Sequence, residues 1–407
     1  MAISLKENIS VGLSDFWSRK VRSFIVILGI VLGTMSIVVV TSIINGINKQ
    51  TMSWLMERGG LANITVRRNW QDQSIQGQRK YFDLKEFNNI NKLIPEAQYI
   101  SPSLRSYQKF SHGQEKFNHP VFGVNEDFTG IEEWNVANGR FVKDFDVKQV
   151  NDVIVIGSKI KEEFFGSKKA IGELITVFDR RFKVIGVMEH RYMKGNGMSG
   201  ENSLGYLNRR AFVPLTTFIN KGTGEDRIYE FKLKAASAES APALGEKLNN
   251  IILNMRGGKQ VFEVETAVEE AKSMEKNSSI FQLVFTLISA ISLFIGAIVI
   301  SNIMLATIKE RTREIGIRIA VGARRRDIFT QFLVQTILVS VIGGILGLLV
   351  GLSLLEVASK FLEMELFATT STILLAIVSS AFVGFLAGVI PAIIASRLDP
   401  ITALRYE

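Results

Sequence analysis

The feature that most constrains this chain is a set of four apolar segments that contain no charged residue. They cover residues 23–45, 280–308, 328–355 and 372–396. A helix that rises about 1.5 Å per residue needs roughly 20 residues to cross the roughly 30 Å hydrocarbon core of a bilayer, and each segment is long enough. A cleaved signal peptide is the alternative for the first segment, but its apolar region is too long and no small-residue cleavage site follows. The sequence therefore predicts an integral membrane protein with four transmembrane helices.

The charges next to these segments predict their orientation. Residues 1–22 have the pattern of an amphipathic surface helix and end in a basic cluster, and residues 309–327 hold seven basic residues against three acidic ones. Residues 356–371 have no positive excess. Short basic segments beside membrane spans stay in the cytoplasm. We therefore expect residues 1–22, 309–327 and the tail 397–407 to be cytoplasmic, and residues 356–371 to form a short outer loop.

Residues 46–279 differ from the apolar segments, because charges recur every few positions among short apolar runs and turn residues. This pattern predicts an extracytoplasmic α+β domain between the first and second transmembrane helices. The chain contains no cysteine, so this domain has no disulfide to stabilise it. Strands are expected at residues 63–67, 121–124, 152–156, 174–178, 182–187, 228–234 and 261–265, and helices at 84–93, 159–165 and 238–255.

The sequence gives no catalytic, cofactor-binding or metal-binding set. It lacks a Gly-x-x-x-x-Gly-Lys-Ser/Thr loop, and its histidines, His112, His119 and His190, have no spacing typical of metal ligands. The uncharged spans disfavour a proton-coupled or ion-coupled transporter. The net charge of +9 is spread along the chain without a basic stripe and interleaved aromatics, so we expect no nucleic-acid partner.

The basic segment 309–327 has two interpretations. It is either a loop that only fixes the topology or an elbow that docks onto a cytoplasmic partner. Its local fold is also open: Ile315, Ile317 and Ile319 alternate as in a strand, whereas Glu314 and Arg318 have the i, i+4 spacing of a helix.

Two long motifs carry a resemblance to a known family. The run ERTREIGIRIAVGARRR (310–326) precedes an apolar span rich in glycine, and the chain ends in PAIIASRLDPITALRYE (391–407). Both resemble ABC transporter permeases of the macrolide-exporter (MacB) type, which are related to lipoprotein-releasing permeases. NGRF (138–141) and VIVIGS (153–158) resemble the outer domain of the same family. The resemblance implies a porter-like part containing a βαβ unit and an inserted second part, and residues 69–120 match nothing in it.

The resemblance also implies a coupling role for the elbow. It would sit in a groove of an ATP-binding cassette subunit, through residues Arg313, Glu314, Ile315, Gly316, Ile317, Arg318, Gly322 and Ala323. ATP and Mg would be bound by that separate subunit rather than by this chain. A second copy of the chain and membrane lipid are further expected partners, and a periplasmic adaptor and outer-membrane channel are expected only in a cell with two membranes.

These observations predict a non-enzymatic permease subunit in the bacterial cytoplasmic (inner) membrane that drives export or extraction of antibiotics, peptides or lipids. A lipoprotein-releasing permease, or a transmembrane regulator that activates a cell-wall hydrolase, is the alternative. Two further questions stay open. The glycines of the third and fourth spans serve either packing within the chain or a dimer interface. The Gly- and Asn-rich segment 190–205 is expected to be a surface loop, because it lacks the ending of a phosphate-binding loop.

Overall fold

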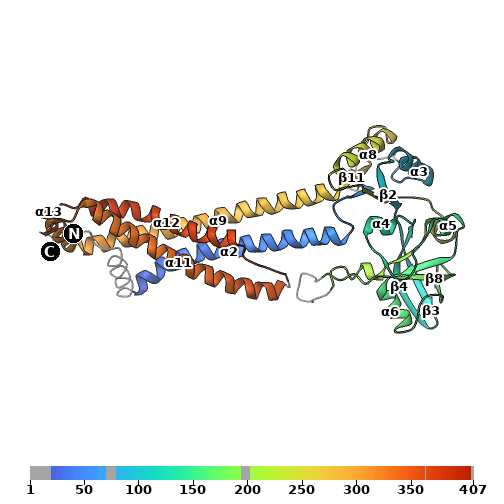
Figure 1. The fold of residues 1–407 in the computed structure, drawn as a ribbon, viewed down its shortest axis with the longest axis horizontal. Coiled ribbons are helices and arrows are strands. Elements are labelled where there is room, and N and C mark those ends of the chain that lie inside the picture. Colours follow the sequence, from blue (N-terminus) through green and yellow to red (C-terminus); the bar gives the residue numbers. More distant parts are fainter. Residues whose placement is uncertain (1–19, 70–78, 194–201, 363, 405–407) are drawn as a thin grey trace. The chain divides into compact units, whose positions relative to one another are not determined.

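The computed structural model describes residues 20–69, 79–193, 202–362 and 364–404. These residues form two units (Figure 1). The α+β unit comprises residues 49–276, and the helical unit comprises the described residues before and after it. Most of the expected N-terminal amphipathic helix and the centre of the 190–205 loop lie outside the described residues.

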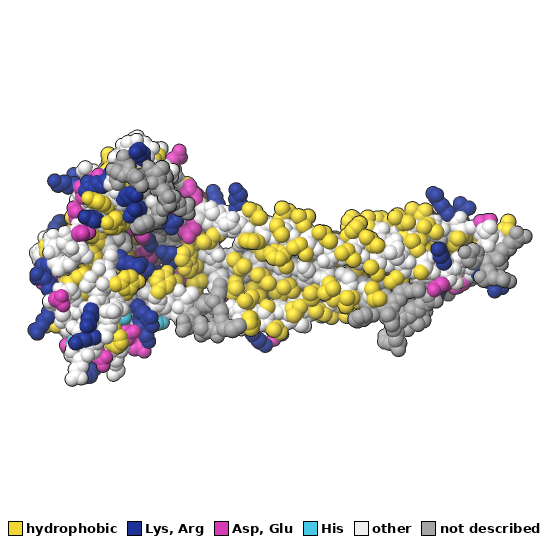
Figure 2. All heavy atoms as spheres, turned by 180° about the vertical axis from the view of Figure 1, so that it is seen from behind, with side chains coloured by type: hydrophobic (Ala, Val, Ile, Leu, Met, Phe, Trp, Pro, Cys, Tyr) yellow, Lys and Arg dark blue, Asp and Glu magenta, His cyan; other side chains and the backbone are white. Residues whose placement is uncertain are grey.

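The helical unit is built from long apolar helices. Its elements α2 (Lys20–Glu57), α9 (Ala267–Glu310), α11 (Arg325–Leu362) and α12 (Thr370–Ser396) are long and apolar enough to cross a membrane. Hydrophobic side chains cover most of the face of this unit shown in Figure 2. The four-helix prediction is confirmed. Both α2 and α9 are longer than the apolar segments, since residues such as Glu, Lys and Ala next to those segments also favour helix.

Glycines let these helices approach one another closely. A Cβ on Gly344 of α11 would lie 2.2 Å from Oγ of Ser380 in α12, and one on Gly388 would lie 2.0 Å from Oγ1 of Thr336. Ser340 of α11 also donates a hydrogen bond to the carbonyl oxygen of Ser380. These contacts agree with the first of the two interpretations, in which the glycines allow helices of the same chain to pack closely.

The α+β unit contains a four-stranded antiparallel sheet. Its strands are ordered β11–β1–β10–β2. Helices α3 (Leu84–Leu93) and α8 (Ala241–Met255) contribute to the apolar core on one side of it. The strand bounds are β1 (Asn63–Arg68), β2 (Ala97–Pro102), β10 (Glu230–Ala235) and β11 (Phe262–Thr266).

A second, seven-stranded sheet has the order β5–β8–β6–β9–β4–β3–β7, with an additional pairing of β8 with β7. Its parallel pairs are β6 with β8 and β4 with β9. Short helices α4 (Phe128–Glu132), α5 (Asp144–Lys148), α6 (Ser158–Phe165) and α7 (Leu215–Thr217), together with 3-10 and π turns at Leu207–Arg209 and Phe218–Thr223, complete the unit. The strand bounds are β3 (Leu104–His112), β4 (Glu115–Val124), β5 (Val136–Gly139), β6 (Val153–Ile156), β7 (Leu174–Val177), β8 (Arg180–Met188) and β9 (Ala211–Pro214).

The α+β prediction is confirmed, and all seven expected strands are present in whole or in part. Four further strands were not predicted, namely β2, β3, β5 and β9. The longest of them, β3, carries the exposed residues Arg105, Tyr107 and Lys109 on one face. Because few of its residues are apolar, it becomes recognisable as a strand only through its nine-residue antiparallel register with β4.

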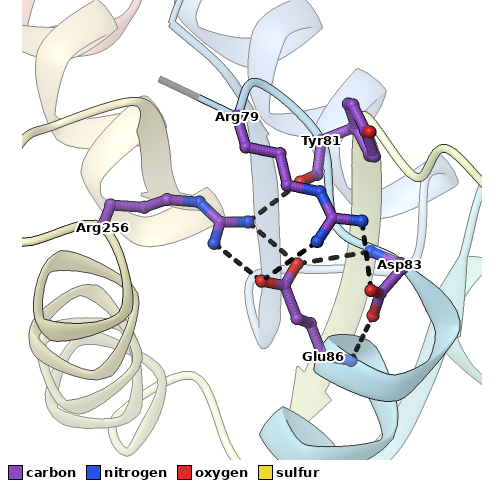
Figure 3. A network of polar contacts seen from close by, with 5 residues as sticks. All are labelled: Arg79, Tyr81, Asp83, Glu86 and Arg256. Carbon is purple, nitrogen blue, oxygen red and sulfur yellow. Dashed lines mark hydrogen bonds and ion pairs between the residues drawn. The ribbon is translucent and has the colours of Figure 1, made fainter. Parts of the chain in front are cut away.

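A polar network joins the N-terminus of α3 to the C-terminus of α8 (Figure 3). Arg256, which follows α8, donates to both carboxylate oxygens of Glu86, at 2.9 and 3.0 Å, and to the carbonyl oxygen of Tyr81 at 2.9 Å. Asp83 accepts from the backbone nitrogen of Glu86 at 2.7 Å and is paired with Arg79 at 3.1 Å. The backbone hydrogen bond from Glu86 lowers the pKa of Asp83, which keeps this helix cap ionised.

Candidate docking site around helix α10

The basic segment between α9 and α11 folds as a helix rather than a strand. Helix α10 (Thr312–Ala320) follows α9 after Arg311. It ends where Gly322 adopts a φ of +105°, a left-handed conformation that glycine tolerates best. Beyond this turn, the side chain of Asp327 accepts from the backbone nitrogen of Arg324 at 3.2 Å, in the first turn of α11.

One face of α10 is fixed inside the helical unit. Ile315 is 3% exposed and belongs to an apolar cluster with Ile308, Ile328 and Phe332. Gly316 is also buried, and a Cβ at this position would lie 2.6 Å from Cβ of Ala403 in α13 (Pro400–Leu404). The sequence did not predict this contact with the C-terminal segment.

The opposite face of α10 is exposed. Arg313 and Glu314 are exposed, Ile317 is 46% exposed, and Val321, directly after the helix, is 84% exposed. Exposed apolar side chains mark a protein interaction surface where they form a contiguous patch rimmed by polar residues. Ile401 of the adjoining α13 is 70% exposed and adds to the apolar side chains at this end of the unit.

Arg318 links α10 to α11. Its Nη2 donates to Oε1 of Glu314 at 2.7 Å, and its Nη1 donates to Oε1 of Gln331 at 3.2 Å. Gln331 is 8% exposed and lies in α11. The i, i+4 pair of Glu314 and Arg318 was visible in the sequence, whereas Gln331 was not, because its role depends on how α11 packs.

The predicted coupling residues thus fall into two groups. Ile315 and Gly316 are buried and hold the helix in place. The exposed or half-exposed residues that a partner can reach are Arg313, Glu314, Ile317, Arg318, Gly322 and Ala323. Three exposed arginines follow directly: Arg324 precedes α11, and Arg325 and Arg326 are its first two residues. The arrangement presents a basic, partly apolar surface suited to docking.

The histidines lie in the α+β unit and make local contacts. His119 is 4% exposed, with Nε2 2.8 Å from Oε2 of Glu163. His112 Nδ1 lies 2.9 Å from the carbonyl oxygen of Leu174, and His190 Nδ1 lies 2.9 Å from Oγ of Ser158. These contacts position strands and loops of the domain.

In a comparison with known proteins, both units match known protein families. Residues 23–269 match the MacB-like periplasmic core domain, and residues 286–400 match the FtsX-like permease C-terminal domain. The chain is 31% identical, over 98% of its length, to the macrolide export ATP-binding/permease protein MacB of Bdellovibrio bacteriovorus, of which it covers 62%. It is 29% identical to the pyoverdine export ATP-binding/permease protein PvdT of Pseudomonas syringae pv. tomato, over 99% of this chain and 60% of that protein.

The chain therefore spans about three fifths of the length of these relatives. The crystal structure of the periplasmic region of MacB from Actinobacillus actinomycetemcomitans is similar, with 20% identity and a TM-score of 0.46 over 55% of this chain and 97% of that one. The family matches cover most of both units, and the chain belongs to the MacB-type ABC transporter permeases.

Proposed function

We propose that this chain is the permease part of an ABC transporter that converts ATP hydrolysis by a separate nucleotide-binding subunit into motion of the α+β domain. The main observation behind this proposal is that α10 has one buried face and one exposed face. One face is held by Ile315 and Gly316, while Ile317 and Val321 are exposed on a surface rich in arginine.

The exposed side of α10 suits a partner with an apolar groove edged by carboxylates. Burying Ile317 and Val321 in such a groove would remove apolar surface from water, which contributes about 25 cal/mol per Å². Arg313 and the arginines at the start of α11 would meet the carboxylates at the edge. Charge pairing of this kind contributes more to orientation and association rate than to affinity.

The contacts that α10 makes with α11 and α13 would transmit a displacement of α10 to both helices. Arg318 hydrogen-bonds with Gln331 of α11, and Gly316 packs against Ala403 of α13. A displacement imposed on α10 would therefore act on α11 and on the C-terminal segment together. ATP and Mg would be bound by the nucleotide-binding partner, which would close and open in step with hydrolysis.

The proposed setting is the bacterial inner membrane, with both termini and α10 in the cytoplasm and the α+β domain outside. A second copy of the chain and membrane lipid would cover the exposed apolar side chains of α9, such as Phe281, Leu287 and Phe294. In a cell with two membranes, a periplasmic adaptor and an outer-membrane channel would complete the path.

The proposed cargo is an amphiphilic molecule of the size of an antibiotic, a peptide or a lipid. The named relatives include macrolide and pyoverdine exporters, which is consistent with cargo released outside the inner membrane. The spans carry no charged residue that could interact with a polar solute inside the membrane. This supports a protein that transmits a conformational change across the membrane rather than one that carries a polar solute through it.

The test is to purify the tagged chain from its native host, identify the proteins that come with it and measure ATPase activity. We expect an ATP-binding subunit to copurify. Glu314→Ala and Arg318→Ala should leave ATP hydrolysis in place but reduce its coupling to transport. Glu356→Ala is the matched control, because it breaks an exposed i, i+4 pair with Lys360, at 2.9 Å, near the other end of α11. Full transport in both α10 variants, or a chain that purifies without any ATPase, would refute the proposal.

A second candidate is a transmembrane regulator that activates a cell-wall hydrolase. In this case the α+β domain would contact the hydrolase, and residues 286–400, which match the FtsX-like permease C-terminal domain, would carry the signal across the membrane. The same purification distinguishes the two functions: copurification of a hydrolase that is activated in the presence of ATP, without export of amphiphiles, would support the regulator.

A further inference from the structure

Strand β3 of the seven-stranded sheet has an unpaired edge that the transport proposal does not use. On one side, all nine of its residues pair in register with β4. On the other side, Ser111 pairs with Thr176 of β7. Within the described part of the chain, the backbone of residues 104–110 makes no hydrogen bond on this second side. We call this side of residues 104–110 the free edge.

The free edge holds backbone groups that can pair with a further strand. In an antiparallel pair, successive residues direct their N–H and C=O groups alternately toward the partner strand and away from it. About half of residues 104–110 therefore direct both groups away from β4. A row of such groups is a template for one more strand, so natural sheets either protect an exposed edge or use it for binding.

The side chains of β3 alternate between the two faces of the sheet. Leu104 and Phe110 belong to the apolar core. Between them, Arg105, Tyr107 and Lys109 are exposed on the opposite face, and Tyr107 is 63% exposed. An added strand would therefore meet three accessible side chains along the free edge.

The exposed face beside the free edge is basic. The register places Lys116 of β4 opposite Ser111, so Lys116 lies on the same face as Arg105 and Lys109. All three basic side chains are exposed, and none forms an ion pair with a residue that the structure describes. No residue on this face of the β3–β4 pair is acidic. The positive charge of this face is therefore not neutralised by the pair itself.

Arg105 and Tyr107 are held against each other. The guanidinium of Arg105 lies 4.9 Å from the centroid of the Tyr107 ring, and its Nη2 donates to the Tyr107 hydroxyl at 3.3 Å. Side chains that are ordered before binding lose less conformational entropy when a partner arrives. Tyrosine and arginine are also among the residues that contribute most to the affinity of protein interfaces. This pair therefore suits a role in partner binding.

The charges decide which kind of strand the free edge accepts. A second copy of β3, added in antiparallel register about Tyr107, would place each Arg105 opposite a Lys109 of the other copy. Like charges directly opposite each other destabilise a strand pair, so the edge is protected against self-association. A segment with carboxylates at these positions would instead form an ion pair at each of them.

We propose that the free edge of β3 binds an extended acidic segment of a partner protein as an added strand. Backbone hydrogen bonds to residues 104–110 would hold the segment, and the side chains would select it. The segment would carry acidic residues opposite Arg105 and Lys109, with an apolar residue between them opposite Tyr107. Ion pairs at an exposed face contribute to selectivity and association rate, and salt screens them, so binding should weaken as the ionic strength rises.

The test uses the purified full-length chain in detergent and the fluorescence anisotropy of three labelled peptides. The first peptide, Ser-Glu-Thr-Val-Thr-Glu-Ser, has the proposed pattern. The second has lysine in place of both glutamates. The third has proline in place of both threonines, which removes backbone donors and disfavours a regular strand. We expect the first peptide to bind at least tenfold more tightly than either of the others.

Equal binding of the proline peptide would indicate attraction by charge alone, as to an anionic polymer or a lipid surface, and would overturn strand addition. Hydrogen–deuterium exchange measured by mass spectrometry checks where the first peptide binds. It should slow exchange of the backbone amides of residues 104–110. Absence of binding by the first peptide, or binding without this protection, would overturn the proposal. Protection that rises with protein concentration in the absence of peptide would also overturn it, because β3 would then pair with a second copy.

The double variant Arg105→Glu/Lys109→Glu should weaken binding of the first peptide at least tenfold and allow the lysine peptide to bind. Lys85→Glu/Lys92→Glu is the matched control, because both lysines are exposed in α3, which contributes to the core beside the four-stranded sheet. Thermal unfolding of each variant checks that the fold is retained. Equal affinity of wild type and Arg105→Glu/Lys109→Glu for the first peptide would contradict the proposal. The assay requires no ATP-binding subunit, so its outcome is separate from that of the transport proposal.

Discussion

Gly316 of α10 and Ala403 of α13 are packed so closely that a Cβ on the glycine would lie 2.6 Å from the Cβ of the alanine. Real side chains do not approach this closely, so α10 can rest on α13 in this arrangement only because residue 316 has no side chain. The C-terminal segment thereby helps to hold the helix that we propose to contact the ATP-binding subunit.

Replacing Gly316 by alanine should therefore separate α10 from α13. We expect a loss of about 1–3 kcal/mol in the free energy of unfolding, the usual range for overpacking, partly offset by the higher helix propensity of alanine. Adding Ala403→Gly should recover much of this loss, because it removes the opposing Cβ. A double-mutant cycle measured by thermal unfolding in detergent gives the coupling. If the two effects simply add, the contact has no energetic importance.

Val321 should matter for partner binding but not for folding. Its side chain is 84% exposed, so Val321→Asp removes little packing within the chain. We expect the unfolding temperature to change little, while copurification of the ATP-binding subunit falls at least tenfold, because a carboxylate would be buried in an apolar groove. Leu93→Asp, an exposed position in α3 that is 52% accessible, is the control and should leave copurification intact. Unchanged copurification of Val321→Asp would exclude this residue from the interface.

Glu132 and Lys232 form a buried ion pair that should be sensitive to the loss of one partner. Glu132 is 1% exposed, and Nζ of Lys232 lies 2.5 Å from its Oε1. Glu132→Gln leaves the ammonium without its counter-charge, so we expect a cost of about 3–5 kcal/mol in the free energy of unfolding. The double variant Glu132→Gln/Lys232→Met should be more stable than Glu132→Gln alone. Denaturant unfolding measures both, and equal stability of the single and double variants would contradict this account.

The same carboxylate gives a pH dependence with a definite sign. Burial by itself would raise the pKa of Glu132, but the charge and hydrogen bond of Lys232 lower it below its ordinary value of 4.5. The stability contributed by the ionised carboxylate is therefore present at neutral pH and above about pH 4.5, and is lost as the pH falls through the lowered value. Glu132→Gln has no carboxylate to protonate at this position. We therefore expect its acid unfolding curve, measured by circular dichroism, to lack the loss of stability that protonation of Glu132 causes in the wild type.

His119 should make the α+β unit less stable in mild acid. Burial among Phe110, Phe117 and Phe164 lowers its pKa below 6.5, although the nearby Glu163 opposes the shift. As the pH falls below 6.5, the unfolded chain takes up a proton that the folded chain still excludes, so stability decreases.

The measurement is the unfolding temperature at pH 7.5 and pH 5.5 in wild type and His119→Gln. The difference between the two pH values should be smaller in the variant, since glutamine does not titrate. His112→Gln serves as the control histidine and should keep the wild-type dependence. The same pH dependence in wild type and His119→Gln would show that His119 does not cause the effect.

The sequence by itself determined the four transmembrane segments and the presence of an α+β domain between the first two. These properties can be read locally, because an uncharged apolar run of membrane length has few other stable environments. The i, i+4 pair of Glu314 and Arg318 was also visible in this way. Most of the strands followed from short apolar or alternating runs.

The tertiary structure alone decided how distant segments meet. The pattern of Ile315, Ile317 and Ile319 suited either a strand or a helix, and packing of Ile315 and Gly316 against α11 and α13 selected the helix. Glu132 and Lys232 are 100 residues apart in the chain, and nothing in either local sequence indicates the partner. Such contacts depend on the free energy of the whole packed domain, which no local periodicity encodes.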